Sequence, residues 1–194
     1  GIYGARPNFM DMDGDGDLDL ITSEFGSYVY DGTFLYMENV GNSQIPEFVF
    51  PDESDPIIFF MQLRNPTISL ADLDGDNDFD LVAGSNDGML HYYENQGNST
   101  EGMFVQKCNQ DNPFFGGLSV RGNSDPILVD IDEDGDLDLI SGMNCDLDGE
   151  VLRYFENTGT MSTPTFIYRF GLENPFPEFI LSPPVIGETQ VTSG

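Results

Sequence analysis

The fold is decided by the stretch Asp130-Ile-Asp132-Glu-Asp134-Gly-Asp136-Leu-Asp138-Leu-Ile140. This stretch places five carboxylates at alternate positions of nine residues and then becomes apolar at once. Related stretches occupy residues 11–21 and 72–82, so the pattern occurs three times in one register. Two carboxylates about 5 Å apart repel each other by roughly 3 kcal/mol at an effective dielectric of about 20. A single copy would also fit a solvated acidic turn, but three copies predict loops that bind a cation.

The chemistry of these loops favours Ca²⁺, which takes six to eight oxygen ligands in flexible geometry. We number the loop positions from 1 to 9, so that position 1 is Asp11, Asp72 or Asp130. The sequence predicts three Ca²⁺ sites. Their acidic residues are Asp11, Asp13, Asp15, Asp17 and Asp19 in loop 1, Asp72, Asp74, Asp76, Asp78 and Asp80 in loop 2, and Asp130, Asp132, Asp134, Asp136 and Asp138 in loop 3.

An EF-hand is the competing interpretation of the loops. It requires Gly at its sixth position, a bidentate Glu at its twelfth, and flanking helices. Counted from Asp13, the twelfth residue is Glu24 but the sixth is Leu18. Counted from Asp74 or Asp132, the twelfth residue is Ser85 or Met143. Because the flanking segments are also β-like, we do not expect an EF-hand.

The similarity between the three units extends well beyond the loops, with a period of about 60 residues. Such self-similarity is the signature of a repeat architecture. Each loop is preceded by a proline and an apolar run, and is followed by a second apolar run and an Asp-Gly pair that is typical of a hairpin turn. A third run then ends in Glu-Asn-x-Gly, and a fourth short run begins with Phe. The third runs are residues 35–41, 91–97 and 153–159, and the fourth are residues 48–50, 104–106 and 166–168.

Four β-rich runs per unit, with no useful helical period, favour an all-β fold of three four-stranded propeller-type blades. The predicted boundaries are residues 1–60 for blade 1, 61–120 for blade 2 and 121–180 for blade 3. Residues 181–194 are predicted to be a partial fourth repeat or an exchanged strand, because Pro184-Val-Ile186 aligns with Pro126-Ile-Leu128. Linkers rich in Pro and Phe join the units, and we expect their aromatic residues to pack between blades.

The charge of the chain limits its partners. It has 35 acidic and 6 basic residues and a formal net charge of −29. So few cations cannot neutralise many phosphates, which argues against nucleic acids and anionic membrane surfaces. No apolar run approaches 18 residues, so no transmembrane helix is predicted.

Three features together favour a secreted or cell-surface protein. Cys108 and Cys145 are the only cysteines and are predicted to form a disulfide, with two buried free thiols as the alternative. Asn98-Ser99-Thr100 is an N-glycosylation sequon, with Asn98 as the acceptor. Ca²⁺ sites suit the millimolar Ca²⁺ outside cells. No signal peptide is visible at Gly1, although a mature secreted chain would have lost one.

These residues resemble the FG-GAP/VCBS repeat family, the calcium-binding blades of integrin-α-like β-propellers, over about residues 6–168. The units look more like the VCBS version, since the Phe-Gly and Gly-Ala-Pro dyads are not in register and Glu133 replaces the usual glycine of loop 3. The resemblance implies that the side chains at positions 1, 3, 5 and 9 and the backbone carbonyl at position 7 bind Ca²⁺. In this sequence the resemblance therefore implies the backbone carbonyls of Asp17, Asp78 and Asp136 as position 7 ligands. It implies Asp19, Asp80 and Asp138 as the position 9 ligands.

A row of three blades would leave two open faces and exposed strand edges. The sequence therefore predicts that copies of the chain assemble into a ring or filament through these faces, or that the blades belong to a longer propeller. The expected function is that of a non-enzymatic, extracellular, Ca²⁺-stabilised protein with a structural or adhesive role.

A lectin-like module that binds a glycan is the alternative, because Tyr92, Tyr93, Tyr154 and Phe155 could stack on sugars, although alternation along a strand explains them more simply. A protein ligand is equally open. A hydrolase is not expected, since the single histidine, His91, stands where the other repeats have Leu35 and Arg153.

Overall fold

The computed structural model describes residues 5–24, 33–51, 63–98, 102–116, 118, 120, 122–143 and 151–176. Within these residues lie twelve β-strands and two short 3-10 helices. The strands form three separate four-stranded sheets, so the predicted all-β architecture is confirmed.

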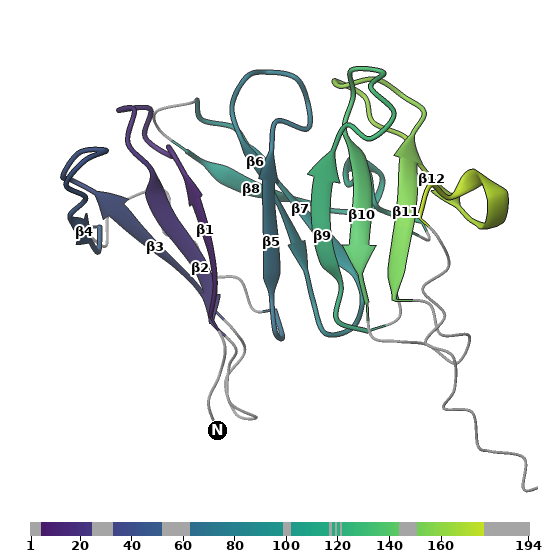
Figure 1. The fold of residues 1–194 in the computed structure, drawn as a ribbon, viewed down its shortest axis with the longest axis horizontal. Helices are drawn as coiled ribbons and strands as arrows, with labels where there is room; N and C mark the ends of the chain where they lie inside the picture. The colour runs from purple at the N-terminus through teal and green to yellow at the C-terminus, as the bar shows by residue number, and fades with distance from the viewer. Residues whose placement is uncertain are drawn as a thin grey trace, which may run out of the picture.

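Each sheet is an antiparallel meander of four consecutive strands, and Figure 1 shows the three sheets side by side in chain order. The bounds of the strands are as follows. Blade 1 contains β1 (Ala5–Met10), β2 (Asp19–Glu24), β3 (Thr33–Asn39) and β4 (Phe48–Val49). Blade 2 contains β5 (Thr67–Ala71), β6 (Asp80–Gly84), β7 (Leu90–Asn95) and β8 (Phe104–Lys107). Blade 3 contains β9 (Asp125–Val129), β10 (Asp138–Gly142), β11 (Leu152–Asn157) and β12 (Phe166–Arg169).

The acidic loops join the first strand of each blade to the second. In all three blades the second strand begins at position 9 of the loop, where Asp19, Asp80 and Asp138 pair with the last residue of the first strand. The apolar run that the sequence shows begins one residue before this strand. The loop is thus closed at its base by a strand pair, and its other carboxylates project beyond the sheet.

The core of the molecule lies between the blades. All five residues of β6 are buried, because blade 2 is covered on both sides. One side of a blade points toward the blade before it, and we call this its preceding face. The other side is its following face. Alternation along each strand, with a period of two residues, assigns every side chain to one of them.

The two interfaces between blades use the same pair of faces. Between blades 1 and 2, Ile21 on the following face of blade 1 packs with Leu81 and Tyr93 on the preceding face of blade 2. Between blades 2 and 3, the corresponding cluster joins Val82 to Phe155. A following face therefore always meets a preceding face.

The inner strands β1, β5 and β9 converge in the middle of the molecule (Figure 1). The Thr67 hydroxyl donates a hydrogen bond to the Ser124 carbonyl at 2.9 Å, and this contact links blade 2 to blade 3. An ion pair of 2.6 Å between Arg6 and Asp125 joins β1 to β9. The three blades therefore bend around a common centre instead of lying in a flat row.

The linker between blades 2 and 3 supplies part of the core, as predicted. Phe114 is 3% exposed and stacks on Phe166 of β12 with ring centroids 5.0 Å apart. The linkers also contain the 3-10 helices η1 (Asn109–Asp111) and η2 (Gly171–Glu173), which the sequence did not predict.

Some sequence predictions fall outside the described residues. They include the linker at residues 55–60, two of the three Asp-Gly turns and the fourth repeat at residues 181–194. Among the residues that the structure describes, none forms a helix with the length and hydropathy needed to cross a membrane.

Candidate metal centres

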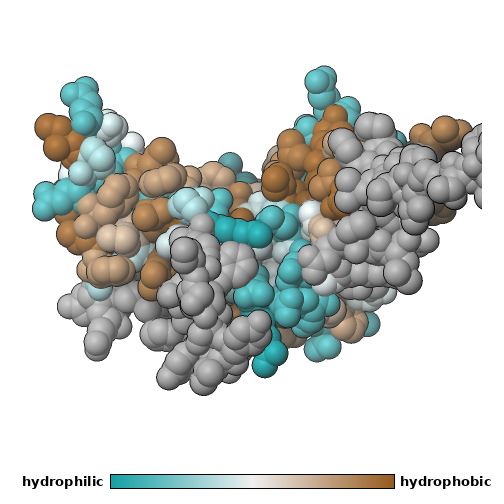
Figure 2. Space-filling model, turned by 60° about the horizontal axis from the view of Figure 1, so that its bottom comes forward, coloured by the Kyte–Doolittle hydropathy of each residue, from teal (hydrophilic) through white to brown (hydrophobic). Residues whose placement is uncertain are grey.

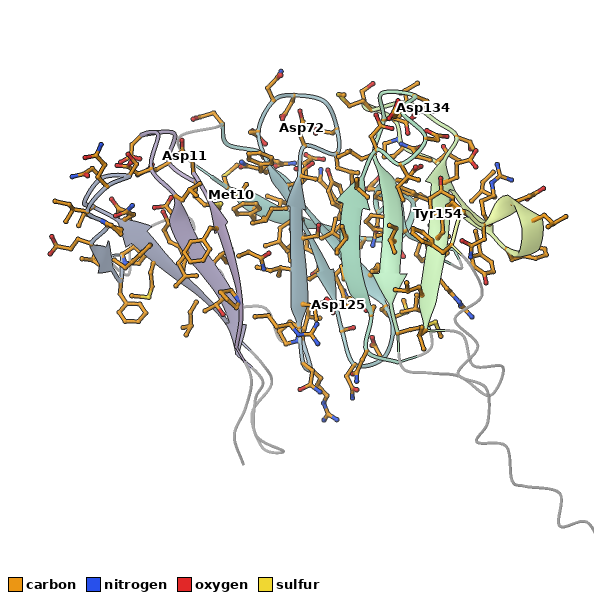
Figure 3. The ribbon with its side chains drawn as sticks, in the orientation of Figure 1. Met10, Asp11, Asp72, Asp125, Asp134 and Tyr154 are labelled. Carbon is orange, nitrogen blue, oxygen red and sulfur yellow. The ribbon has the colours of Figure 1, made fainter. Side chains whose placement is uncertain are left out.

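The acidic loops of the three blades lie at the same end of the molecule, as the labels of Asp11, Asp72 and Asp134 in Figure 3 show. In each loop the carboxylates at positions 1, 3 and 5 come within 4.8 Å of one another. The three groups are Asp11, Asp13 and Asp15; Asp72, Asp74 and Asp76; and Asp130, Asp132 and Asp134. The structure thus brings together nine of the fifteen predicted carboxylates in three clusters.

Backbone N–H groups of the loop hold these carboxylates in place. In loop 2, Asp72 accepts hydrogen bonds from Gly75 N–H at 2.7 Å and Asn77 N–H at 3.0 Å. Asp74 accepts one from Asp76 N–H at 3.2 Å, and Asp76 accepts one from Asp78 N–H at 3.0 Å. Asp72 accepts on both of its oxygens, whereas these bonds use only one oxygen of Asp74 and one of Asp76 and leave the other oxygen of each available for a cation.

The loops can turn this tightly because positions 4 and 6 adopt positive φ. The position 4 residues are Gly14, Gly75 and Glu133, with φ of 73°, 80° and 63°. Position 6 is Gly16, Asn77 or Gly135, again with positive φ. Loop 3 therefore keeps the turn of the others although Glu133 replaces glycine. One bond differs, because Asp130 Oδ1 is buried and has no hydrogen-bond partner.

The carboxylate at position 9 anchors each loop to the third strand of its blade. Asp80 is 1% exposed and accepts bonds from Leu73 N–H at 3.0 Å, Asn95 N–H at 2.8 Å and the Tyr92 hydroxyl at 2.9 Å. Asp138 has the same three kinds of partner, and Asp19 accepts the two backbone bonds. A carboxylate has about four acceptor sites, so three bonds leave about one for a metal.

The carboxylates at position 7 give the most direct indication of a cation site. Asp78 is 5% exposed and Asp136 is 8% exposed. The Oδ1 atom of each is buried without a hydrogen-bond partner. Burying a charged oxygen without a partner is strongly unfavourable. The positive charge of a cation at the loop would stabilise these buried oxygens, so the donor set fits a hard metal ion.

The raised pKa values of several loop carboxylates also favour a cation site. Burial, opposed by the hydrogen bonds from Asn95 and Leu73, raises the pKa of Asp80 to about 7. Burial and the Asp76 carboxylate raise the pKa of Asp78 to about 6. Burial likewise raises the pKa of Asp13 and Asp74. Without a cation, these loops therefore hold their charges at neutral pH only against burial and mutual repulsion.

The asparagine of the shared Glu-Asn-x-Gly motif has a structural role that the sequence spacing alone did not reveal. The N–H of Asn95 donates to Asp80, while its side-chain oxygen accepts bonds from Gly97 N–H at 3.0 Å and Met103 N–H at 2.7 Å. The equivalent Asn39 and Asn157 make the same contacts. This asparagine therefore connects the metal loop to the turn before the fourth strand.

The other predicted modification sites are placed only in part. Cys108 is exposed, and its predicted partner Cys145 lies outside the described residues, so the disulfide stays a prediction. Asn98 is exposed, as a glycosylation acceptor must be, while Ser99 and Thr100 lie outside the described residues.

The aromatic residues that were candidates for stacking on sugars are all buried. Tyr92, Tyr93 and Phe155 lie in the clusters between blades, whereas Tyr154 lies on the following face of blade 3 and packs against Phe176. Tyr92, Tyr93, Tyr154 and Phe155 are 4%, 7%, 3% and 2% exposed. None of them offers a face to a glycan. The lectin-like interpretation of these four residues is therefore wrong, and their simpler role in packing is the one observed.

His91 lies beside a group that the sequence did not single out. The buried Ser85 hydroxyl donates to Asp87 and lies 3.4 Å from His91 Nε2. A nucleophilic serine would donate its proton to the histidine, with the acid behind that histidine. Here Asp87 itself accepts the hydrogen bond from the Ser85 hydroxyl, and the Met89 N–H also donates to Asp87 at 3.0 Å. The group closes the turn between β6 and β7.

The sequence was compared with known proteins. A search of curated proteins returned no match. The sequence model of the FG-GAP-like repeat matches residues 72–141. The chain contains an FG-GAP-like repeat. The matched segment begins at position 1 of loop 2 and ends in β10, so the FG-GAP-like repeat includes two of the three acidic loops.

Proposed function

We propose that the chain is an extracellular Ca²⁺-binding protein of propeller-type repeats with a structural or adhesive role and no enzymatic one. The observation that carries this proposal is the convergence of three carboxylates within 4.8 Å in every loop. The buried and unpartnered oxygens of Asp78, Asp130 and Asp136 add to it.

Ca²⁺ is the cation that fits these loops best. Positions 1, 3 and 5 supply three carboxylates, and the carbonyl at position 7 and the carboxylate at position 9 would raise the number of protein ligands to five. Water or bidentate binding would complete the six to eight oxygens that Ca²⁺ prefers. Mg²⁺ requires near-ideal octahedral geometry and keeps several waters, which suits a crowded anionic loop less well. FG-GAP-like repeats often bind Ca²⁺.

Ca²⁺ bound in this way would stabilise the folded chain. It would neutralise carboxylates that otherwise repel each other, and would fix the connection between the first two strands of every blade. Because the loops form only in the folded chain, the binding free energy becomes folding free energy. One site at 100 times its Kd contributes about 2.7 kcal/mol.

The proposed location and role rest on the family of the repeat, the surface charge and the outer blades. FG-GAP-like repeats are typically extracellular, and millimolar Ca²⁺ outside cells would keep the sites filled. The strongly acidic surface and the open blade faces suit a protein that assembles with other copies or presents a rigid surface to a partner. The same faces would also suit three blades of a larger propeller.

Calorimetric titration of the chelated protein with Ca²⁺ tests the proposal. We expect three ions to bind per chain. Asp76→Asn keeps the oxygen that accepts the Asp78 N–H but removes the charge at position 5, so the variant should bind two ions with the affinity of the native protein.

Asp111→Asn is the matched control, because Asp111 is an exposed acid in η1, outside all loops. It should bind three ions. Failure of the native chain to bind any Ca²⁺ would contradict the proposal. A variant of Asp76 with unchanged binding would show that this cluster is not the site.

A further inference from the structure

The acidic loop of blade 2 contacts a turn of blade 3. A Cβ at Gly75, position 4 of loop 2, would lie 3.4 Å from Met161 Cγ and 3.6 Å from both Met161 Sδ and Ser162 Cβ. Met161 and Ser162 belong to the turn between β11 and β12, which lies at the same end of the molecule as loop 2 (Figure 1). The two residues therefore cover part of loop 2 from outside its own blade.

This contact falls on the residue that orients a predicted metal ligand. The Gly75 N–H donates a hydrogen bond of 2.7 Å to Asp72, the carboxylate at position 1 of loop 2. Gly75 also has a φ of 80°, which the loop needs for its tight turn. Packing of the Met161 side chain against Gly75 therefore supports the loop in the shape that brings its carboxylates together.

The turn that carries Met161 is itself held by hydrogen bonds. The backbones of Thr160 and Thr163 exchange bonds of 3.3 and 3.0 Å, and their hydroxyl oxygens lie 2.7 Å apart. At the base of the turn, the side-chain oxygen of Asn157 accepts bonds from two N–H groups of the turn. Because Met161 lies at the tip of a closed turn, little further ordering is needed when an ion binds to loop 2.

Loop 1 also faces a following blade, but the contact there differs. The residue of blade 2 that aligns with Met161 is Ser99, which lies outside the described residues. A cavity of about 280 Å³ lies between loop 1 and blade 2, and its lining includes Gly14 and Asn98. Gly14 is exposed, whereas the equivalent Gly75 of loop 2 is half-buried. Loop 2 is therefore the better covered of these two loops.

Exposure alone would not single out Met161, which is 47% exposed. Figure 2 shows hydrophobic residues at several places on the surface, among them the arm formed by blade 1. What distinguishes Met161 is that its side chain lies against a loop with five acidic residues. An apolar side chain in that place excludes water from the loop, and a lower local dielectric strengthens the attraction between a cation and a carboxylate.

We propose that Met161 is an affinity-determining residue of the loop 2 metal site, supplied by the next blade. Its side chain shields one flank of the loop from water and supports the turn at Gly75. Loop 2 therefore binds Ca²⁺ more tightly, and releases it more slowly, than loop 1. This inference rests on the proposed function and deepens it, because it makes two of the acidic loops unequal and assigns part of a metal site to a neighbouring blade.

Full-length chains with one working loop test the inference. Asp15→Asn with Asp134→Asn leaves loop 2 intact, and each asparagine keeps an oxygen that can accept the N–H two residues later. Asp76→Asn with Asp134→Asn leaves loop 1 intact in the same way. Calorimetric titration at pH 8 should give a Kd about tenfold lower for loop 2 than for loop 1, as is typical of residues that surround a metal site. Stopped-flow mixing with EGTA should show slower release from loop 2.

In the chain with loop 2 intact, Met161→Ser introduces the residue that blade 2 has at the aligned position. It should weaken Ca²⁺ binding about tenfold and speed release, because the loop loses its apolar cover. Met161→Leu keeps an apolar side chain of similar size and should retain most of the affinity. Met89→Ser is the matched control, since Met89 is also 47% exposed but lies between β6 and β7, at the other end of blade 2. It should leave the Kd unchanged.

The outcomes separate this inference from the proposed function. An unchanged Kd and release rate of loop 2 in Met161→Ser would overturn the inference and leave the proposed function standing. An equal loss from Met161→Ser in both single-loop chains would also overturn it, because the substitution would then act on the whole fold and not on loop 2. A loop 1 that binds Ca²⁺ as tightly as loop 2 has the same consequence. A native chain that binds no Ca²⁺ contradicts the proposed function, and the inference with it.

Discussion

Glu133 shows how one residue limits the stability of a loop. It adopts a φ of 63° at a position where the other loops have glycine, and left-handed backbone is unfavourable by about 1–2 kcal/mol for a residue with a Cβ. We expect Glu133→Gly to raise the free energy of unfolding by about 1 kcal/mol. Glycine would relieve this backbone strain. Its N–H could also donate a hydrogen bond to Asp130, as the Gly75 N–H donates to Asp72. Urea unfolding in Ca²⁺ measures it.

Glu133→Gln provides the control for charge, because it removes the carboxylate and keeps the Cβ. A gain from glutamine as large as that from glycine would show that repulsion, and not backbone conformation, limits loop 3.

Substitution of Asp80 distinguishes the contribution of a loop to folding from its contribution to metal binding. Asparagine at this position would turn one acceptor oxygen into a donor that faces the N–H of Asn95 or the donors of Leu73 and Tyr92. A buried donor left without an acceptor is unfavourable by about 1–3 kcal/mol. We expect Asp80→Asn to lower the free energy of unfolding by about 2 kcal/mol in EGTA at pH 8.

Asp76→Asn should change the stability in EGTA by less than about 0.5 kcal/mol, because Asp76 is exposed and keeps its acceptor oxygen. Equal losses in the two variants would mean that position 9 is not a special anchor.

At the residue scale, the sequence predicted the convergence at positions 1, 3 and 5, because alternate acids in a tight loop point to one centre. It did not predict that position 9 bonds the third strand. Asp138 and Asn157 are 19 residues apart and meet only because β10 pairs with β11. The residues that separate them in the sequence carry no sign of that contact.

At the scale of strands, Gly84 controls how closely blades 2 and 3 approach. A Cβ at Gly84 would collide with the Ser124 carbonyl and would lie 2.7 Å from Thr67 Oγ1. Overpacking of this kind is unfavourable by about 1–3 kcal/mol. We expect Gly84→Ala to lower the free energy of unfolding by about 2 kcal/mol, as measured by urea unfolding in Ca²⁺.

Gly142 is the equivalent residue of blade 3 and provides the matched control. Among the described residues its Cβ would meet only Asp125, 3.3 Å away, so Gly142→Ala should stay within about 1 kcal/mol of the native protein. A similar loss in both variants would show that alanine disturbs the strand itself and not the contact between blades.

The strands were predictable because every unit repeats four apolar runs, and three copies make each run unambiguous. The residues at which the second strands begin were harder to predict. The predicted second runs begin with leucine or phenylalanine, whereas β2, β6 and β10 begin at the aspartate of position 9. An ionisable residue can begin a buried strand here because the third strand satisfies its carboxylate. The 3-10 helices were missed because three residues are too few to show a period.

At the scale of the whole molecule, the loops predict opposite effects of pH with and without Ca²⁺. The pKa values of Asp80 and Asp78, about 7 and about 6, lie above the unfolded value near 3.9. Between about pH 4 and 7 the native state without metal therefore binds more protons than the unfolded state. Its stability falls as pH rises through this window. The unfolding temperature in EGTA should thus be higher at pH 5 than at pH 7.5.

Ca²⁺ requires deprotonated carboxylates, so the stabilisation that it adds should shrink over the same fall in pH. Scanning calorimetry at pH 5 and 7.5, with Ca²⁺ or EGTA, measures both trends. A protein in EGTA that loses stability between pH 7.5 and pH 5 would contradict the assignment of these two groups.

The measurement that most directly tests the Ca²⁺-stabilised fold is thermal unfolding of the native chain at pH 7.5, in millimolar Ca²⁺ and then in EGTA. A single site at 100 times its Kd adds about 2.7 kcal/mol, which raises the unfolding temperature of a chain of this size by about 5–10 °C. With three loops occupied we expect a larger rise, and addition of excess Ca²⁺ after EGTA should restore it. Identical unfolding temperatures in Ca²⁺ and EGTA would show that the acidic loops are not structural metal sites.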